Sequence, residues 1–403
     1  MAKPPNPARL SDQQRFDWLR LIRSENVGPR TFRALLKSCG GAGAALEALP
    51  ELARRGGAAR PLRVAPVEEI ERELAVARKL GVRLVALSEP DYPPLLSQID
   101  SAPPLLALVG RETALHRPAV AIVGSRNASA AGLTFAERLA RGLGEAGFVV
   151  VSGLARGIDQ RVHAATFKTG AVGVLAGGHA KPYPPEASPL MARIAEFGAV
   201  VSEMPIEWEP RGRDFPRRNR IVSGLALGTI VVEAARSSGS LITARFALEQ
   251  NRQVFAVPGS PLDPRAEGAN ELLKQGATIC THVDDVLTAL EPLRSSDLLA
   301  SLDEGRRSGL ALDLVPRATE PAWPEAEFDK GGEGLEPADR VEGTLNRIVA
   351  LLSPSPISLD ELARAADASA REVRVALMEL ELAGRIELSG DRVALRPAAG
   401  VAF

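Results

Sequence analysis

Arginines and glycines that can bind an anion cluster in four short stretches of the sequence. The first is VGSRN at 123–127, in which Gly124, Ser125 and Arg126 lie between an apolar run and a helical pattern. Backbone amides at a helix N-terminus and an arginine guanidinium both bind phosphate groups. The stretch lacks the GxGxxG pattern and a following acidic residue for a ribose, so we expect a phosphate site and no dinucleotide cofactor. A plain turn between strand and helix is the alternative for this stretch alone.

The second stretch, SGLARGID at 152–159, contributes Gly153 and Arg156. Glycines let the backbone approach a ligand closely, and Arg156 adds a positive charge. Asp159 is expected either to cap the next helix or to pair with an arginine. His163 lies four residues later and therefore faces the same side of that helix, a spacing that would suit a catalytic dyad. We favour a structural, hydrogen-bonded histidine.

The third stretch, RGRDFPRRNR at 211–220, has five arginines against one aspartate and is the sharpest local charge in the chain. Its candidate DNA contacts are Phe215, Arg217, Arg218, Asn219 and Arg220. A solvated basic loop is the alternative. Because arginines recur at three strand ends or helix starts, we favour a groove that binds the phosphate backbone.

The fourth stretch, RSSGS at 236–240, offers Ser238 and Gly239 at another expected helix N-terminus, which gives a third anion position. Glu233 ends the preceding strand and would suit a hydrolase, but no partner acid, activated nucleophile or metal cluster is visible beside it. The four histidines are scattered and the two cysteines are far apart. We therefore expect no metal, no cofactor and no catalytic residues, and a binding protein rather than an enzyme.

These stretches follow short β-branched runs that alternate with amphipathic helical patterns between about residues 82 and 286. The predicted strands are 119–123, 148–152, 171–175, 199–202, 229–233 and 253–257. The alternation predicts an α/β fold with a Rossmann-like, doubly wound parallel sheet. Such sheets bind ligands at the carboxyl ends of their strands, where the glycine-rich and arginine-rich stretches lie.

The chain has 403 residues, which favours two or three domains. Residues 1–75 have helical periodicity and predict a small helical domain of the helix-hairpin-helix type. Its turn, NVGPRT at 26–31, is either a phosphate-binding hairpin or a simple turn between packed helices. Residues 76–292 are expected to form an extended Rossmann-like domain that binds single-stranded DNA, and residues 293–340, which have no periodicity, a flexible linker.

Residues 341–397 predict a winged-helix domain, because three helical patterns precede an expected hairpin around Gly390 and Asp391. The third helix balances Arg371 and Arg374 against several glutamates, which is a poor surface for a groove lined with phosphate. We therefore expect this domain to contact protein rather than DNA.

Composition restricts the class of protein further. A net charge of −1 gives no overall basic signature, so a nucleic acid has to be bound by a local cluster. Aromatic residues make up only 4%, which leaves arginine as the main contact. No run approaches the roughly 20 apolar residues of a membrane span, and two distant cysteines suit a reducing compartment. We expect a cytoplasmic protein without a membrane span.

Taken together, these stretches resemble the DNA-processing protein A family, also called Smf. The matching segments are VGSRNAS at 123–129, SGLARGID at 152–159, SEMP at 202–205, FPRRNRIVSGL at 215–225, EAARSSGSLITARFALEQ at 233–250 and VFAVPG at 254–259. The resemblance implies a helical N-terminal domain, a Rossmann-like core that binds single-stranded DNA and self-associates as a homodimer, and the winged-helix domain of some members. The family's strand-binding positions fall on Ser125 and Arg126, on Gly153 and Arg156, and on 215–220.

The resemblance also implies a biological role. Such proteins receive incoming single strands during natural transformation, protect them and help to load the RecA recombinase, so single-stranded DNA and RecA are the expected partners. One loop departs from the family, because GGHAKP at 177–182 replaces the usual Gly-Leu-Asp. We interpret it as a tolerated substitution rather than an addition of His179 or Lys181 to the basic surface.

Two other classes of protein share parts of the pattern. A lysine-decarboxylase-like nucleotide phosphoribohydrolase has a similar core, but it pairs arginine with a catalytic glutamate beside a PGGxGTxxE-type loop, which this sequence lacks. A winged-helix transcription regulator is disfavoured by the acidic balance of the third helix.

Overall fold

The structure is a computed structural model that describes residues 9–294 and 337–396. Residues 295–336, most of the expected linker, lie outside the described residues. The described residues fall into two compact units, one formed by residues 9 and 71–294 and the other by residues 10–70 and 337–396. Helix α4 (Val67–Lys79) crosses the boundary between them.

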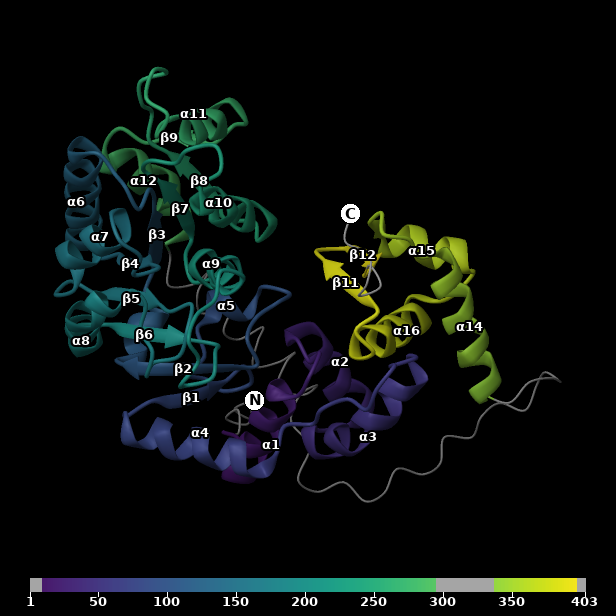
Figure 1. Cartoon of the computed structure of the whole chain (residues 1–403). Coiled ribbons are helices and arrows are strands. Elements are labelled where there is room, and N and C mark those ends of the chain that lie inside the picture. Colours follow the sequence, from purple (N-terminus) through teal and green to yellow (C-terminus); the bar gives the residue numbers. More distant parts are fainter. Residues whose placement is uncertain (1–8, 295–336, 397–403) are drawn as a thin grey trace, which may run out of the picture. The chain divides into compact units, whose positions relative to one another are not determined.

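A nine-stranded sheet forms the centre of the first unit (Figure 1). Its strands are β1 (Arg83–Ala86), β2 (Leu105–Gly110), β3 (Ala119–Val123), β4 (Val149–Ser152), β5 (Ala171–Val174), β6 (Ala199–Ser202), β7 (Gly228–Val231), β8 (Gln253–Ala256) and β9 (Thr278–Ile279). They are ordered β1-β2-β6-β5-β4-β3-β7-β8-β9. Strand β2 pairs antiparallel with β1 and β6, and every neighbouring pair from β6 to β9 is parallel. The predicted Rossmann-like, doubly wound α/β fold is confirmed, with an antiparallel edge that the periodicity did not indicate.

Helices cover both faces of this sheet, which is why its central strands are apolar throughout. They are α5 (Pro94–Ser97), α6 (Ala130–Glu145), α7 (Ile158–Thr166), α8 (Ser188–Phe197), α9 (Asp214–Gly224), α10 (Gly239–Glu249), α11 (Glu267–Lys274) and α12 (Val283–Leu290), with short 3-10 turns η1 (Glu112–His116), η2 (Pro185–Ala187) and η3 (Glu291–Leu293). In Figure 1, α6 and α7 lie on one side of the central strands and α9 and α10 on the other. Leu139 and Leu143 of α6 pack in one core with Val120, Ile122 and Phe255 of the sheet.

The order of the strands reverses at β3. Strand β4 pairs with one edge of β3 and β7 with the other. In open α/β sheets a crevice forms at this point, beyond the carboxyl ends of the strands. The stretches at 123–127, 152–159 and 236–240 all follow strands that end here, so the topology brings together segments that are far apart in sequence.

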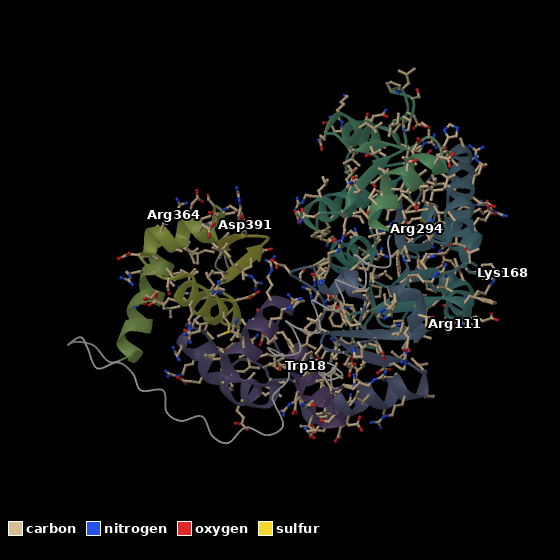
Figure 2. All side chains as sticks on the ribbon, turned by 180° about the vertical axis from the view of Figure 1, so that it is seen from behind. Trp18, Arg111, Lys168, Arg294, Arg364 and Asp391 are labelled. Carbon is tan, nitrogen blue, oxygen red and sulfur yellow. The ribbon has the colours of Figure 1, made fainter. Side chains whose placement is uncertain are left out.

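The second unit contains two small domains. Its N-terminal helices are α1 (Asp12–Arg23), α2 (Pro29–Cys39) and α3 (Ala42–Arg55), and its C-terminal elements are α14 (Pro337–Leu351), β10 (Ile357–Ser358), α15 (Leu359–Ala366), α16 (Ala370–Leu382), β11 (Ile386–Ser389) and β12 (Arg392–Leu395). Trp18 of α1 packs edge-on against Phe32 of α2, with ring centroids 5.0 Å apart (Figure 2). Three helices followed by a hairpin confirm the winged-helix prediction.

Helix α16 packs against α2 and α3 within this unit. Glu379 of α16 is only 1% exposed and forms an ion pair with Arg55 of α3 at 3.0 Å. Burial raises the pKa of the Glu379 carboxyl, and Arg55 opposes that shift. Part of the third helix is therefore covered by the N-terminal helices of the same chain, and its contact with another protein stays a prediction.

The turn at 26–31 takes part in the same contact. The Asn26 amide donates a hydrogen bond to the Leu382 carbonyl at 2.9 Å, and Arg30 donates to the Gly390 carbonyl at 2.6 Å. The Thr31 hydroxyl donates to the Glu381 carboxylate. Side chains of the turn therefore bond to the winged-helix domain, which the sequence did not indicate.

Candidate nucleic-acid interface

A pocket of about 390 Å³ opens beyond the carboxyl ends of β3, β4 and β7. Nine of the twelve expected DNA-binding residues line it: Gly124, Ser125, Arg126, Gly153, Phe215, Arg218, Asn219, Ser238 and Gly239. Its volume is in the range of sites that hold one small ligand or nucleotide. The topology thus gathers the glycine-rich and arginine-rich stretches around one cavity.

Arg126 lies at the wall of this pocket, on the loop between β3 and α6. Its guanidinium carbon is 5.1 Å from the centroid of the Phe215 ring, which belongs to the first turn of α9. An arginine stacked on an aromatic ring keeps its planar fork of donors in one orientation, because the ring restricts its rotation. The loop and α9 therefore present a fixed cation and a flat ring side by side.

Two glycines keep the backbone close to the neighbouring elements. A Cβ atom on Gly124 would lie 2.6 Å from the Ile158 side chain of α7, and one on Gly153 would overlap the Arg218 guanidinium. A side chain at either position would displace a group that lines or supports the pocket. Both glycines are thus explained by close packing against the chain itself, and the expected close approach of a ligand stays a prediction.

Arg218 lines the pocket and is buried. Its Nη1 donates hydrogen bonds to the Gly153 carbonyl and, at 2.8 Å, to the Val174 carbonyl. Burial lowers the pKa of the guanidinium, and the facing Asp159 opposes that shift. Arg218 therefore ties α9 to the ends of β4 and β5 and places a positive charge beneath the cavity.

Asp159 takes one of its two expected roles, as the charge partner of an arginine; it does not cap α7, whose N-cap is Gly157. Its carboxylate accepts a hydrogen bond from the Ala155 amide at 3.3 Å, and it is the charge partner of Arg218. Burial raises the pKa of Asp159, against the lowering effect of Arg218. His163, in the next turn, is completely buried, and this burial lowers its pKa to about 4. Its burial favours the structural interpretation over a dyad open to substrate.

Helix α10 begins at the opposite wall of the pocket. Ser238 is its N-cap and accepts from the Ser240 amide at 3.3 Å. The Ser240 hydroxyl donates to the Gly124 carbonyl at 3.0 Å, and Asn219 donates to the Gly239 carbonyl at 3.1 Å. The positive end of an 11-residue helix therefore faces the cavity, held to β3 and α9 by side-chain bonds.

The start of α6, which was expected to bind an anion together with Arg126, holds a carboxylate of the chain itself. This helix begins at Ala130 with Ser129 as N-cap, and the Glu233 carboxylate accepts hydrogen bonds from the Ser129 amide at 2.9 Å and hydroxyl at 2.5 Å. A carboxylate from the end of β7 already occupies the positive end of the helix. The positive helix end that faces the pocket belongs to α10 instead.

Three expected residues, Arg156, Arg217 and Arg220, do not line the pocket. Arg156 is exposed and pairs with Glu186 at 2.6 Å. Arg217 is also largely exposed and pairs with Glu203 at 3.1 Å. Arg220 is buried in an ion pair with the same Glu203 and donates to the Ser101 carbonyl, so it anchors α9 to the sheet and is not available to a ligand.

A second cavity of about 370 Å³ lies beside α6 and β8, and none of the expected DNA-binding residues lines it. Its charged side chains are acidic, Glu233 and Asp263, which disfavours a phosphate.

His179 is buried, with Nε2 3.1 Å from the Val200 carbonyl, so it does not extend a basic surface. Arg111 and Lys168, at the edge of the unit (Figure 2), lie over the rings of Phe197 and Phe167.

Two absences apply to the described part of the chain only. Within residues 9–294 and 337–396, no group of three or more His, Cys, Asp or Glu side chains is arranged to hold a metal ion. No helix in the same ranges is long and apolar enough to cross a membrane.

The sequence patterns missed two features of the site. Ala235 of the loop after β7 and Ile242 and Thr243 of α10 also line the pocket, and their side chains give no signal of their own in the sequence. The contact of Tyr183 with Phe215 was missed as well, with ring centroids 5.5 Å apart. Only the neighbouring departure at 177–182 drew attention to that loop.

Three family models match the chain: DNA recombination-mediator protein A over residues 83–291, the DprA-like N-terminal HHH domain over 12–76 and the DprA winged helix domain over 335–391. Protein Smf of Synechocystis is 30% identical over 94% of this chain and 97% of its own length, and protein Smf of Escherichia coli is 35% identical over 83% of each. The X-ray structure of DNA processing protein A from Streptococcus pneumoniae matches with a TM-score of 0.58 and 32% identity, over 70% of this chain and 98% of that one. The chain therefore belongs to the DNA recombination-mediator protein A family, also known as DprA or Smf.

Proposed function

We propose that this protein binds single-stranded DNA in the pocket at the ends of β3, β4 and β7. The observation that supports this most is the combination found there: the stacked Arg126 guanidinium, the buried Arg218 charge and the positive end of α10 around one cavity. All three attract a phosphate group. Phe215 adds a ring on which a base can stack.

The proposed contacts differ from those expected from the sequence. Arg126 binds a phosphate in the pocket, and the exposed Arg156 and Arg217 bind flanking phosphates. Their present partners are Glu186, in an exposed ion pair that contributes little, and Glu203, which is buried but keeps its second ion pair, with Arg220, when Arg217 is released. Arg218 supports the pocket floor and adds to its potential, whereas Arg220 holds α9 in place.

The same arrangement argues for binding rather than catalysis. Glu233, the carboxylate that would suit a hydrolase, is hydrogen-bonded at the start of α6. Asp159 is buried against Arg218. The lining then offers anion binding without a paired nucleophile and base, so we propose that nucleotides are bound and not turned over.

We further propose the biological role that the family resemblance implies. The protein receives incoming single strands during natural transformation, protects them and helps to load RecA, and it acts as a homodimer through its Rossmann-like domain. Membership in a family of recombination mediators supports this role. RecA and a second copy of the chain are the proposed protein partners.

A gel-shift comparison with three ligands tests the proposal against its alternatives. We expect a single-stranded oligonucleotide to be shifted at much lower protein concentration than the duplex of the same sequence, and a nucleoside monophosphate to compete only weakly. Preference for the duplex would support a winged-helix regulator. Release of free base from the monophosphate, abolished by Glu233→Ala, would support the phosphoribohydrolase.

A further inference from the structure

Tyr183 is unusual among the aromatic residues of the described ranges, because it is the only one classed as exposed there. Its relative exposure is 49%, whereas every other described tyrosine, tryptophan or phenylalanine is buried or half-buried. It lies in the loop between β5 and η2. Its place beside the pocket distinguishes it from an ordinary exposed side chain.

The ring of Tyr183 contacts the ring of Phe215 at an interplanar angle of 72°. In such an edge-to-face pair at most one face of either ring is covered by the other. At least one face of Tyr183 is therefore left uncovered by Phe215. Phe215 in turn lies against the Arg126 guanidinium and lines the pocket.

Three flat groups thus form a continuous row, Arg126, Phe215 and Tyr183, from three separate segments of the chain. The row begins in the phosphate pocket and ends at an exposed ring. Two cations belong to the segments around Tyr183: the exposed Lys181, two residues before it, and Arg156, which pairs with Glu186, three residues after it. A strand that follows the row meets a guanidinium and two rings, and sequence-tolerant single-strand sites combine these two kinds of group.

We propose that Tyr183 stacks on an unpaired base of the nucleotide next to the one whose phosphate is bound by Arg126, and so helps the site to select single strands over duplex. This inference rests on the proposed function of the same pocket. A base paired within a duplex already has both faces stacked on its neighbours and cannot use the Tyr183 ring. Stacking needs a ring and not a hydroxyl, so phenylalanine serves equally well at this position.

The test uses the full-length protein and two strands of equal length and charge, one with all its bases and one with abasic sites throughout. We expect Tyr183→Ala to weaken binding of the normal strand by about fivefold or more, since loss of one stacked base typically has an effect of this size. Binding of the abasic strand should be unchanged, because its phosphates are still contacted. The dependence on salt should also be unchanged. Tyr183→Phe is the matched control and should bind both strands like the parent.

A second readout is independent of affinity. Emission from a Tyr183→Trp variant should be quenched by the normal strand and not by the abasic one, relative to the parent protein with its own tryptophans. Equal affinities of Tyr183→Ala and parent for the normal strand, or an equal loss on both strands, would overturn the stacking role. If the parent itself fails to bind the normal strand, the proposed function fails and this inference with it, whereas failure of the Tyr183 variants alone leaves the proposed function standing.

Discussion

Arg218 and Arg220 lie two residues apart on α9 and differ in their neighbours. Arg218 is bonded to two backbone carbonyls beneath the pocket and faces Asp159, whereas Arg220 is paired with Glu203 away from it. From the sequence both belonged to one basic cluster, and the pairing with Glu203 gave no local signal because the partner lies 17 residues away. Residue type and spacing predicted where arginines cluster, but not which of these arginines can contact a ligand.

Replacement of Arg218 tests its structural role. Arg218→Met should lower the free energy of unfolding by about 3–5 kcal/mol, because Asp159 would be left buried without its partner. Urea unfolding of the variant and of Arg245→Ala, whose ion pair with Glu249 is exposed on both sides and which is expected to cost less than about 1 kcal/mol, measures the contrast. An Arg218→Met protein as stable as the parent, with a flatter salt dependence of DNA binding, would make Arg218 a simple phosphate ligand.

Two buried histidines predict how stability varies with pH. Burial lowers the pKa of His163 and His179 from 6.5 to about 4. Between these values the unfolded chain binds protons that the folded chain does not, so stability is retained above pH 6.5 and lost as the pH falls towards 4. Each histidine accounts for up to roughly 3 kcal/mol of this loss.

The variant His179→Gln isolates one of these contributions. It is expected to be less stable than the parent at pH 7, where it lacks the native contact with Val200. As the pH falls from 6.5 to 4.5, the difference in stability between the parent and the variant should shrink, because His179 takes up a proton on unfolding and glutamine does not titrate. Urea midpoints of both proteins across this range give the result, and a difference that does not change with pH would contradict the account.

At the scale of elements, all six predicted strands are present, and four of them differ from the observed bounds by one or two residues. The runs at 119–123 and 199–202 agree with β3 and β6, because strands buried on both faces are apolar throughout. The start of α6 was assigned to the ligand, although the carboxylate of Glu233, 104 residues away in the loop after β7, accepts hydrogen bonds from the N-cap residue Ser129. Contacts between distant segments depend on the sheet order, which periodicity does not specify.

Helix α16 provides the test at this scale. Arg55→Ala should lower the free energy of unfolding of the second unit by roughly 3–5 kcal/mol, because Glu379 would stay buried without its ion-pair partner. Arg54→Ala is a matched control, since Arg54 pairs with Glu51 on the exposed surface and should cost under about 1 kcal/mol. Calorimetry of the full chain separates the two outcomes. Equal effects of the two substitutions would show that α16 does not need this contact.

For the whole molecule, the division into two units predicts that only one of them binds DNA. Every residue of the proposed DNA site belongs to residues 71–294, and none to the unit that contains the winged helix. Deletion of residues 337–403 should therefore leave the affinity for single strands within about tenfold of the parent, or roughly 1.4 kcal/mol. Fluorescence anisotropy and a folding control by circular dichroism check this. A folded truncation that loses more would place the winged helix in the DNA site.

The domains of the whole molecule were predictable from the sequence, but their grouping was not. A helical domain, a sheet domain and a winged helix were each predictable from local periodicity. The grouping of the first and last of these into one unit was not, because bonds such as Asn26 to Leu382 join residues 356 positions apart. Neither turn chemistry nor charge pattern identifies such a pair in a single sequence.

The central claim, that Arg126 and its exposed neighbours bind successive phosphates of one strand, is tested most directly by anisotropy with a short oligonucleotide at several salt concentrations. Three contacts, from Arg126, Arg156 and Arg217, predict a slope of log affinity against log salt of about −2, at roughly −0.7 per phosphate. Arg126→Ala should flatten the slope and cost about 1.5–3 kcal/mol. Arg126→Lys should restore only part of the affinity, and Arg141→Ala, which removes another exposed arginine paired with glutamate, should change neither value. A parent slope near zero, or a folded Arg126→Ala protein that binds as tightly as the parent, would contradict the claim.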